Sequence, residues 1–407
     1  MTRAGQAQPL LAARHADSAL CTTPGTTRAL PLSTVGVRGC AGPAQPARRV
    51  PHGMSTRMLL ERRLAGVRDD GAFLVIAVEG GGLRGVVSGA MLIALDDLGI
   101  TRVADAIVGT SAGAINVAYH AAGRGWDALA AYYDLIPTHL LRPARQALRR
   151  PLLRMDYLDQ LFTRDLPLCT EQLRRCPVPV FATVTDVDRQ RTVAVPLGAD
   201  VDVHAWLKAS SWLPVLAGRP LSVQGRRWLD GGVLCPNLVT AADLFPATHV
   251  LSICSRADAV DGPAVGERLV RPILNHWSAG LGDRFIQLRQ QWAADAAQLG
   301  SYADGTFRGS RVLRLTPHPH RVGRLTRDAG LLLEGAHRGY ARVMEYFDGD
   351  PACHVGIGYG KTTTGRIARP ATAAPSPRPG PAAAAVGLPG RDGVSVGAVA
   401  TIRVGAA

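Results

Sequence analysis

A serine lies between two glycines in the run Gly109-Thr110-Ser111-Ala112-Gly113, directly after an apolar segment that ends at Val108. The Gly-x-Ser-x-Gly pattern is typical of a nucleophile elbow, a sharp turn from strand to helix that exposes the serine hydroxyl. Glycines at 109 and 113 let the strand and helix pass closely, and the free amides of the helix start suit a developing negative oxygen. Taken alone, the pattern also fits a glycine-rich turn in which the serine has no role.

A second glycine turn follows the apolar run 73–78. Its residues are Gly80, Gly81, Gly82, Leu83, Arg84 and Gly85. Consecutive glycines can direct several backbone amides toward one point, so we expect this loop to form the oxyanion hole of an acyl-transfer site. Positions 80, 82 and 85 also satisfy G-x-G-x-x-G, which makes a non-catalytic nucleotide-binding module the alternative. That alternative lacks an acidic residue closing a second strand about 20 residues on, because Asp96 and Asp97 come too early.

A serine nucleophile needs a base, and Asp230 is the candidate. It follows a short predicted strand at 228–229 and precedes two glycines, an arrangement that an ordinary Asp-Gly turn also explains. A free carboxylate has a pKa near 4, but burial in a closed site would raise that pKa and make Asp230 a usable base. The alternative is a Ser-Asp-His triad completed by His318 or His320, since this order along the chain is that of α/β-hydrolases.

The elements that must position these residues alternate in type. A strand, a glycine turn and a helix occur twice in succession, which predicts an α/β fold with a parallel sheet and both glycine turns at its carboxyl edge. Strands are expected at 73–78, 177–187, 191–195, 228–229 and 248–253, and residues 100–106 lead to a further strand that ends at 108. Helices are expected at 86–98, 111–122, 126–135, 203–209, 284–299 and 327–347.

Three motifs, in this order, resemble those of the patatin-like phospholipase family. They are the run 79–85, the elbow 109–113 and Asp230-Gly231-Gly232; the segments 182–186 and 209–214 agree with the same family. The resemblance implies a three-layer α/β/α fold with a mainly parallel central sheet. It also implies a Ser111–Asp230 dyad, an oxyanion hole in the loop around Gly81 and Gly82, and hydrolysis of acyl-lipid esters through an acyl-enzyme, without a metal or other cofactor.

Composition divides the 407-residue chain into three parts. The net charge is +14, of which +7 falls in residues 1–65 and +5 in 361–407, leaving +2 for the body. We therefore expect disordered basic ends, 1–65 and 361–407, around a catalytic domain at 66–360, and no nucleic-acid partner. Residues 1–53 are the part whose presence in the native protein is in question, because Met54 and Met58 are alternative starts. The seven scattered cysteines form no C-x-x-C, which favours a reducing, cytoplasmic compartment.

Arginines recur with leucines between them from Arg142 to Arg154. This interval is interpreted as a solvated helix or the edge of a lid, and the alternative is a transient contact with anionic lipid at a membrane surface. The longest apolar run is far shorter than the roughly 18 residues that a membrane-spanning helix needs. The expected substrate is a lipid or other ester, whereas the sequence does not indicate the oligomeric state.

Overall fold

The structure is a computed structural model that describes residues 38–39, 53–68, 70–143, 146, 150–198, 201–236, 238–257 and 265–349. Its strands are β1 (Arg38–Gly39), β2 (Leu74–Val78), β3 (Ala106–Thr110), β4 (Val180–Asp186), β5 (Arg191–Leu197), β6 (Leu221–Val223), β7 (Arg226–Asp230), β8 (His249–Ile253), β9 (Asp304–Phe307) and β10 (Ser310–Leu315). Its α-helices are α1 (Thr56–Leu64), α2 (Gly85–Asp97), α3 (Ala112–Ala121), α4 (Gly125–Asp134), α5 (Ile136–His139), α7 (Met155–Gln160), α8 (Thr170–Arg174), α9 (Val203–Ser210), α10 (Val265–Trp277), α11 (Leu281–Leu299) and α12 (Ala329–Tyr346).

One sheet organises these elements. Its central strands run parallel in the order β4-β3-β2-β8-β10, and antiparallel strands extend it at both edges. The predicted α/β fold with a mainly parallel central sheet is therefore confirmed. Between consecutive parallel strands the chain crosses over through helices, as parallel pairing requires.

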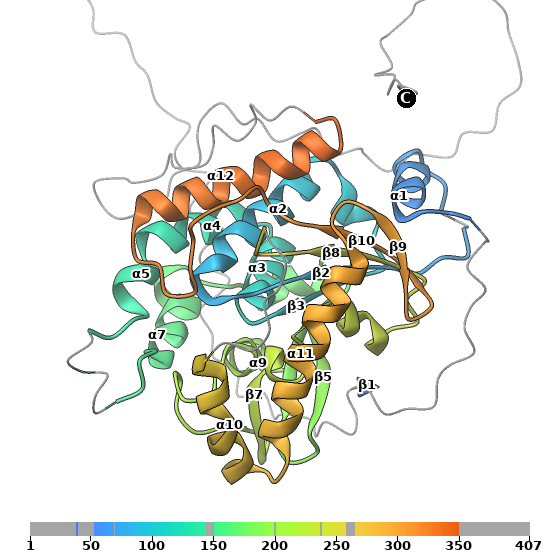
Figure 1. The fold of residues 1–407 in the computed structure, drawn as a ribbon. Helices are drawn as coiled ribbons and strands as arrows, with labels where there is room; N and C mark the ends of the chain where they lie inside the picture. The colour runs from blue at the N-terminus through green and yellow to red at the C-terminus, as the bar shows by residue number, and fades with distance from the viewer. Residues whose placement is uncertain are drawn as a thin grey trace, which may run out of the picture. The chain divides into compact units, whose positions relative to one another are not determined.

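The residues of β2 alternate between two apolar layers, because successive side chains of a strand point to opposite faces. Leu74, Ile76 and Val78 pack into the core beneath helices α2, α3, α4 and α12, which lie together on one side of the sheet (Figure 1). Val75 and Ala77 face the other layer, built from the short helix η7 (Leu238–Leu244) and the end of α11. Burial on both faces explains why β2 is apolar throughout.

Helix α1 corrects the predicted domain boundary. It begins at Thr56, capped by the Ser55 hydroxyl, within the segment expected to be a disordered extension. Leu59 and Leu60 are buried, and the buried Arg63 forms one buried ion pair, with Asp70, and one partly exposed ion pair, with Asp105. The expectation fails for residues 56–64 because tertiary contacts stabilise a helix that shows little apolar periodicity. Of the expected N-terminal extension, the structure describes residues 38–39 and 53–65; the rest lies outside the described residues, as does the expected tail 361–407.

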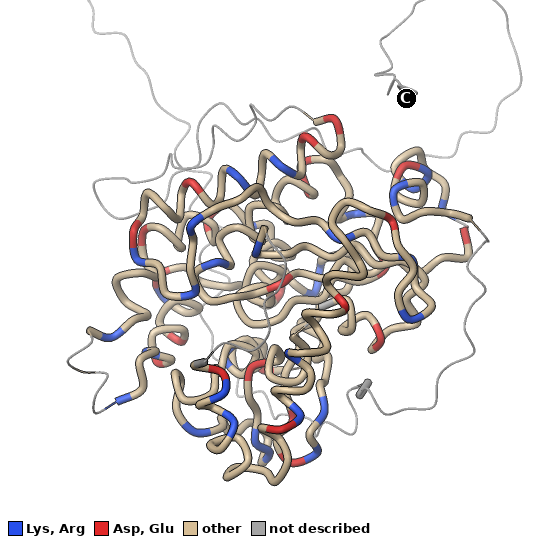
Figure 2. Tube along the Cα trace, in the orientation of Figure 1, with Lys and Arg blue, Asp and Glu red and all other residues tan. Residues whose placement is uncertain are grey.

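Sequence patterns also missed a central strand, β10, and an amphipathic helix, α10, which packs beside α11 as an antiparallel pair (Figure 1). β10 lies parallel to β8, with Leu313 opposite Leu251. Basic and acidic residues are interspersed along the described chain (Figure 2), in keeping with the small net charge of its body.

Candidate active site

Ser111 lies at the junction of β3 and α3, at the carboxyl edge of the sheet. Its backbone has φ 57° and ψ −129°, a strained conformation for a residue with a side chain. Such strain costs on the order of 1–3 kcal/mol and persists only where the surroundings enforce it. The chain therefore turns at Ser111 as the elbow pattern predicts, and only 7% of the residue is exposed.

The predicted glycine loop packs directly against this turn. A β-carbon at Gly80 would lie against the Thr110 carbonyl oxygen and 2.8 Å from the Ser111 β-carbon. Reciprocally, a β-carbon at Gly113 would meet the Val78 carbonyl oxygen. Two strand-to-helix turns thus touch through glycines, and a larger residue at either position would force them apart. Gly109, in β3, faces Gly113 across the elbow in the same way.

Within the predicted oxyanion loop the amides divide into two groups. Those of Leu83, Arg84 and Gly85 already donate to carbonyl oxygens, of Arg324 and of the loop itself. The amides of Gly80, Gly81 and Gly82 donate to no acceptor among the described residues. The candidate donors for an oxyanion are therefore the three consecutive glycines, together with the amide of Ala112 at the start of α3.

Strand β4 brings Asp230 to the elbow. Thr110, the residue before Ser111, pairs with Thr183, and the next residue of β4, Val184, pairs with Asp230 in β7. The parallel strand β3 ends where the antiparallel strand β7 arrives on the same side of β4. Residues almost 120 positions apart in sequence are thus placed next to each other by register alone.

Asp230 is 2% exposed, and one of its oxygens, Oδ1, accepts a hydrogen bond of 2.7 Å from the Gly232 amide. The other, Oδ2, is buried without a hydrogen bond of normal geometry among the described residues. The Ser111 hydroxyl nevertheless interacts with the carboxyl and favours its ionised form. The two side chains are thus adjacent but not joined by a well-formed hydrogen bond, as is common in sites without substrate.

Burial raises the pKa of Asp230 to about 6, against the opposing effects of Ser111, the Gly232 amide and the cations Arg289 and Arg324. Desolvation disfavours the charged carboxylate, so the group retains its proton to higher pH than in water. A carboxyl with this pKa is ionised at neutral pH and yet basic enough to accept a proton from a hydroxyl during attack.

Ser210 is a positioning residue that sequence reasoning did not identify, although the run 209–214 was noted. Its buried hydroxyl accepts a 2.9 Å hydrogen bond from the Ser111 amide and donates one of 2.8 Å to the Thr183 carbonyl. The Asp230 amide donates to the carbonyl of Trp212 in the same segment. Helix α9 and the turn after it therefore fix the backbone of both candidate catalytic residues.

The two histidines of the alternative triad form hydrogen bonds with residues other than Ser111 and Asp230. His318 Nε2 lies 2.8 Å from the Glu345 carboxylate in α12. His320 Nε2 lies 3.0 Å from the Ser255 carbonyl oxygen, and its Nδ1 accepts from the Val322 amide at 3.2 Å. These contacts hold the loop after β10 and favour a site without histidine.

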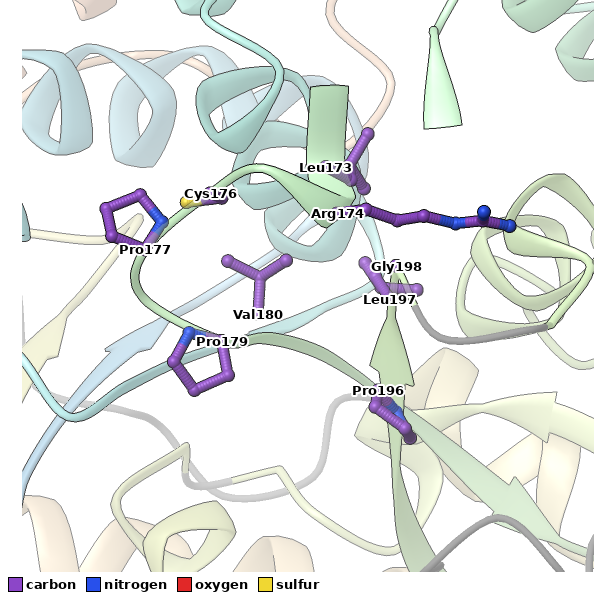
Figure 3. A pocket seen from close by; sticks show the side chains of 9 residues that line it. All are labelled: Leu173, Arg174, Cys176, Pro177, Pro179, Val180, Pro196, Leu197 and Gly198. Carbon is purple, nitrogen blue, oxygen red and sulfur yellow. The ribbon is translucent and has the colours of Figure 1, made fainter. Parts of the chain in front are cut away.

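A separate hollow opens near the start of β4 and the end of β5, around Val180 and Leu197 (Figure 3). These residues lie at the opposite end of β4 from Val184, which pairs with Asp230. The hollow is thus distinct from the site built around Ser111. Within the described residues, no group of three or more His, Cys, Asp or Glu side chains is arranged to hold a metal ion.

Residues 76–243 match the family model of the patatin-like phospholipases. The matched segment contains both Ser111 and Asp230, and it confirms the resemblance drawn from the three motifs. This match supports a lipid hydrolase function. No curated protein sequence matches the chain.

Two solved structures match parts of the chain at low sequence identity. VipD from Legionella pneumophila is 12% identical, with a TM-score of 0.37, over 68% of this chain and 66% of that one. The second match is a chain from the complex of full-length SpcU with full-length ExoU, from the type III secretion system of Pseudomonas aeruginosa. It is 14% identical, with a TM-score of 0.24, over 54% of this chain and 53% of that one. This chain thus spans slightly under two thirds of the first relative and about half of the second.

Among the described residues, no helix combines the length and the hydropathy that crossing a bilayer requires. In the arginine-rich interval, Arg142 donates to the carbonyls of Pro151 and Leu153, whereas Arg145 and Arg149 lie outside the described residues. The expected contact with a membrane surface stays a prediction.

Proposed function

We propose that this protein is a serine acyl hydrolase that cleaves ester bonds of lipids with Ser111 as nucleophile and Asp230 as base. The observation that carries the proposal is the register on β4, which sets a strained serine beside a buried carboxyl whose Oδ2 has no hydrogen-bond partner among the described residues. The match of residues 76–243 to the patatin-like phospholipase family model supports the same reaction class.

In the first half-reaction, the Ser111 hydroxyl attacks the ester carbonyl while Asp230 accepts its proton. The carbonyl oxygen becomes an oxyanion held by the free amides of Gly80, Gly81 and Gly82, aided by the Ala112 amide. Removing one donor of this kind typically costs about 2.7–4 kcal/mol of transition-state stabilisation. The tetrahedral intermediate then collapses, the alcohol leaves with the proton from Asp230, and the acyl group stays on Ser111.

In the second half-reaction, water attacks the acyl-enzyme and gives its proton to Asp230. The Ser111 oxygen leaves and takes that proton back, which releases the fatty acid and restores the enzyme. One carboxyl alternates between base and acid in both halves, so the reaction needs no third catalytic side chain. A pKa of about 6 suits both roles near neutral pH.

A fluorophosphonate probe tests the nucleophile. We expect covalent labelling at Ser111 alone, located by mass spectrometry of peptides, and none in Ser111→Ala. Labelling at a different serine would refute the assignment. The same protein incubated with NAD, NADP or FAD should show no tight binding, whereas tight binding without labelling would favour the nucleotide-binding alternative.

The base is tested with 4-nitrophenyl esters and phospholipids on the wild type and on Asp230→Asn. The variant should lose hydrolysis by several orders of magnitude, because a neutral amide cannot accept the serine proton. Substituting His318 and His320 by Ala should leave most of the activity. A comparable loss in the histidine variants would instead support the Ser-Asp-His triad.

A further inference from the structure

Four arginine side chains from separate segments surround the candidate oxyanion loop. They form what we call the arginine cluster: Arg84 in η3 (Gly82–Arg84), Arg256 after β8, Arg289 in α11 and Arg324 in the loop before α12. Burial lowers the pKa of Arg84 to about 10; Glu79 opposes this effect, and the other three guanidinium groups add to it. The four positive charges therefore act on one another within one region.

Helix α11 directs two of these cations toward the site. Phe285, Arg289 and Trp292 are spaced i, i+4 and i+7, so they lie on one face of the helix. The Arg289 guanidinium lies over the Phe285 ring and that of Arg256 over the Trp292 ring, each at 5.3 Å from the centroid. Arg289 also donates to the carbonyl of Gly232, two residues from Asp230, at 3.3 Å.

Several donors in this region are buried without an acceptor. The Nε atoms of Arg84, Arg256 and Arg289, and the hydroxyl of the fully buried Ser255, have no hydrogen-bond partner among the described residues. A β-carbon at Gly81 would lie 3.0 Å from Arg84 Nε and 3.1 Å from Ser255 Oγ, so both donors border the glycine loop. A buried donor without an acceptor is energetically unfavourable, and a ligand rich in acceptor oxygens would satisfy it.

The described carboxylates do not balance these charges. Glu79 lies 4.0 Å from Arg256 and also accepts from the Ser255 amide. Glu267 lies 3.2 Å from Arg324 and 3.8 Å from Arg289. Two glutamates therefore face four guanidinium groups in the described part of the chain, and Asp230 offsets at most one further charge. Among the described residues, a net positive charge therefore remains beside the candidate nucleophile.

We propose that the arginine cluster, with the Ser255 hydroxyl, binds the phosphate of a lipid whose head group carries a net negative charge, and selects it over zwitterionic lipids. The inference rests on the proposed function and names its substrate class. In a glycerophospholipid, phosphate and acyl esters share a three-carbon backbone, so a phosphate beside Gly81 keeps an ester carbonyl within reach of Ser111. A guanidinium group can donate two parallel N–H hydrogen bonds to the oxygens of one phosphate. A choline group would bring a further positive charge to a region that already has an excess of positive charge.

The direct test is calorimetric binding of monomeric dihexanoyl phosphatidylglycerol and dihexanoyl phosphatidylcholine to Ser111→Ala, which cannot turn them over. We expect the anionic lipid to bind at least about ten-fold more tightly, since hydrogen bonds to charged groups contribute about 1.5–3 kcal/mol. Arg256→Gln and Arg289→Gln, added to Ser111→Ala, should each reduce this ratio toward one. Arg256→Lys should retain part of it, because the charge remains.

Arg308→Gln is the matched control, because this half-exposed arginine pairs with Asp243 at the β9–β10 hairpin, away from the cluster. It should leave the ratio of affinities unchanged. Equal affinity of the two lipids, or a ratio unaffected by both cluster variants, would overturn the proposal. Inorganic phosphate that binds as tightly as the anionic lipid would assign the cluster to free phosphate and overturn the lipid assignment.

Hydrolysis of the same two lipids by the wild type separates this inference from the proposed function. Selective binding without hydrolysis of either lipid or of a 4-nitrophenyl ester refutes the acyl hydrolase and leaves the anion site standing. Hydrolysis of both lipids at equal kcat/KM, with equal binding, refutes the head-group selection and leaves the hydrolase standing.

Discussion

Asp230 is the residue whose chemistry depends most on its surroundings. In water its carboxyl would be a weak base, and in the folded chain burial raises its pKa to about 6. The same burial that makes it useful also costs stability, because ionising a carboxyl away from water is unfavourable. Two measurements follow from this one pKa.

Activity should depend on pH through the ionisation of Asp230. We expect kcat/KM for a neutral 4-nitrophenyl ester to rise through about pH 6 and then level off, because only the ionised carboxylate accepts the serine proton. The measurement is a pH–rate profile on a substrate that does not itself titrate. A profile that is flat from pH 5 to 8 would contradict the assigned base.

The contribution of Asp230 to the free energy of unfolding should fall as pH rises, whereas activity should increase. The unfolded chain releases this proton near pH 3.8 and the folded chain near 6, so Asp230 destabilises the fold increasingly as pH rises between these values. Above pH 6 the full cost is about 3 kcal/mol. Asp230→Asn should therefore be more stable than the wild type at pH 8 and equally stable near pH 3.5, as measured by urea unfolding. An Asn variant less stable at pH 8 would refute the raised pKa.

Ser210 gives a residue-scale prediction about positioning. Ser210→Ala leaves the Ser111 amide and the Thr183 carbonyl without their partner, which should cost about 1–3 kcal/mol of stability and lower kcat more than it raises KM. Ser211→Ala is the control, because this neighbouring hydroxyl is buried without a hydrogen-bond partner among the described residues. Equal effects of the two substitutions on kcat would exclude a positioning role for Ser210.

At the scale of elements, the site depends on how closely two strand-to-helix turns approach. The β2–α2 and β3–α3 turns touch through Gly80 and Gly113, and this contact sets the free loop amides beside Ser111. Parallel strands put both turns at one edge of the sheet, but only the absence of side chains lets them meet.

Gly80→Ala tests that contact. The added methyl would lie 2.8 Å from the Ser111 β-carbon and against the Thr110 carbonyl, so we expect destabilisation of about 1–3 kcal/mol and loss of fluorophosphonate labelling. Gly305→Ala in β9 is the control, because no atom of the described residues lies within 4 Å of its added carbon. Thermal unfolding and labelling rate measure both effects. A Gly80→Ala protein that labels at the wild-type rate would contradict the packing.

At the scale of the whole molecule, α1 extends the domain further toward the N-terminus than composition indicated. Arg63 in α1 forms a two-pronged ion pair with Asp70 and bonds Asp105 and the carbonyl of Val103. These contacts join α1 to the chain just before β2 and just before β3. A short helix with little apolar periodicity is thereby made part of the core.

Arg63→Met should cost about 3–5 kcal/mol, because it strands the buried Asp70 carboxylate without its partner. Arg57→Met on the same helix should cost no more than about 1 kcal/mol, because its pairs with Glu61 and Asp348 are half-exposed. Urea unfolding of both variants at pH 7 gives the comparison. Similar losses would mean that α1 is held by its leucines alone.

The sequence by itself determined what depends on neighbours along the chain. The apolar run of β2, the glycine turns and the helical spacing of α2 and α12 are local patterns, and they predicted these elements and the class of fold. Ser111 and Asp230 were identifiable for the same reason, since each lies in a short run of residue types that its turn requires.

Only the tertiary structure decided which distant residues meet. Strand β4 pairs first with β3 and then with β7 on the same side. This register, and not the spacing of residues along the sequence, brings Ser111 next to Asp230. Ser210, Ser255 and Arg289 carry no sequence signal, because a single serine or arginine in a helix or loop looks like many others. The roles proposed for them depend on burial and on partners contributed by other segments, which pattern and periodicity do not encode.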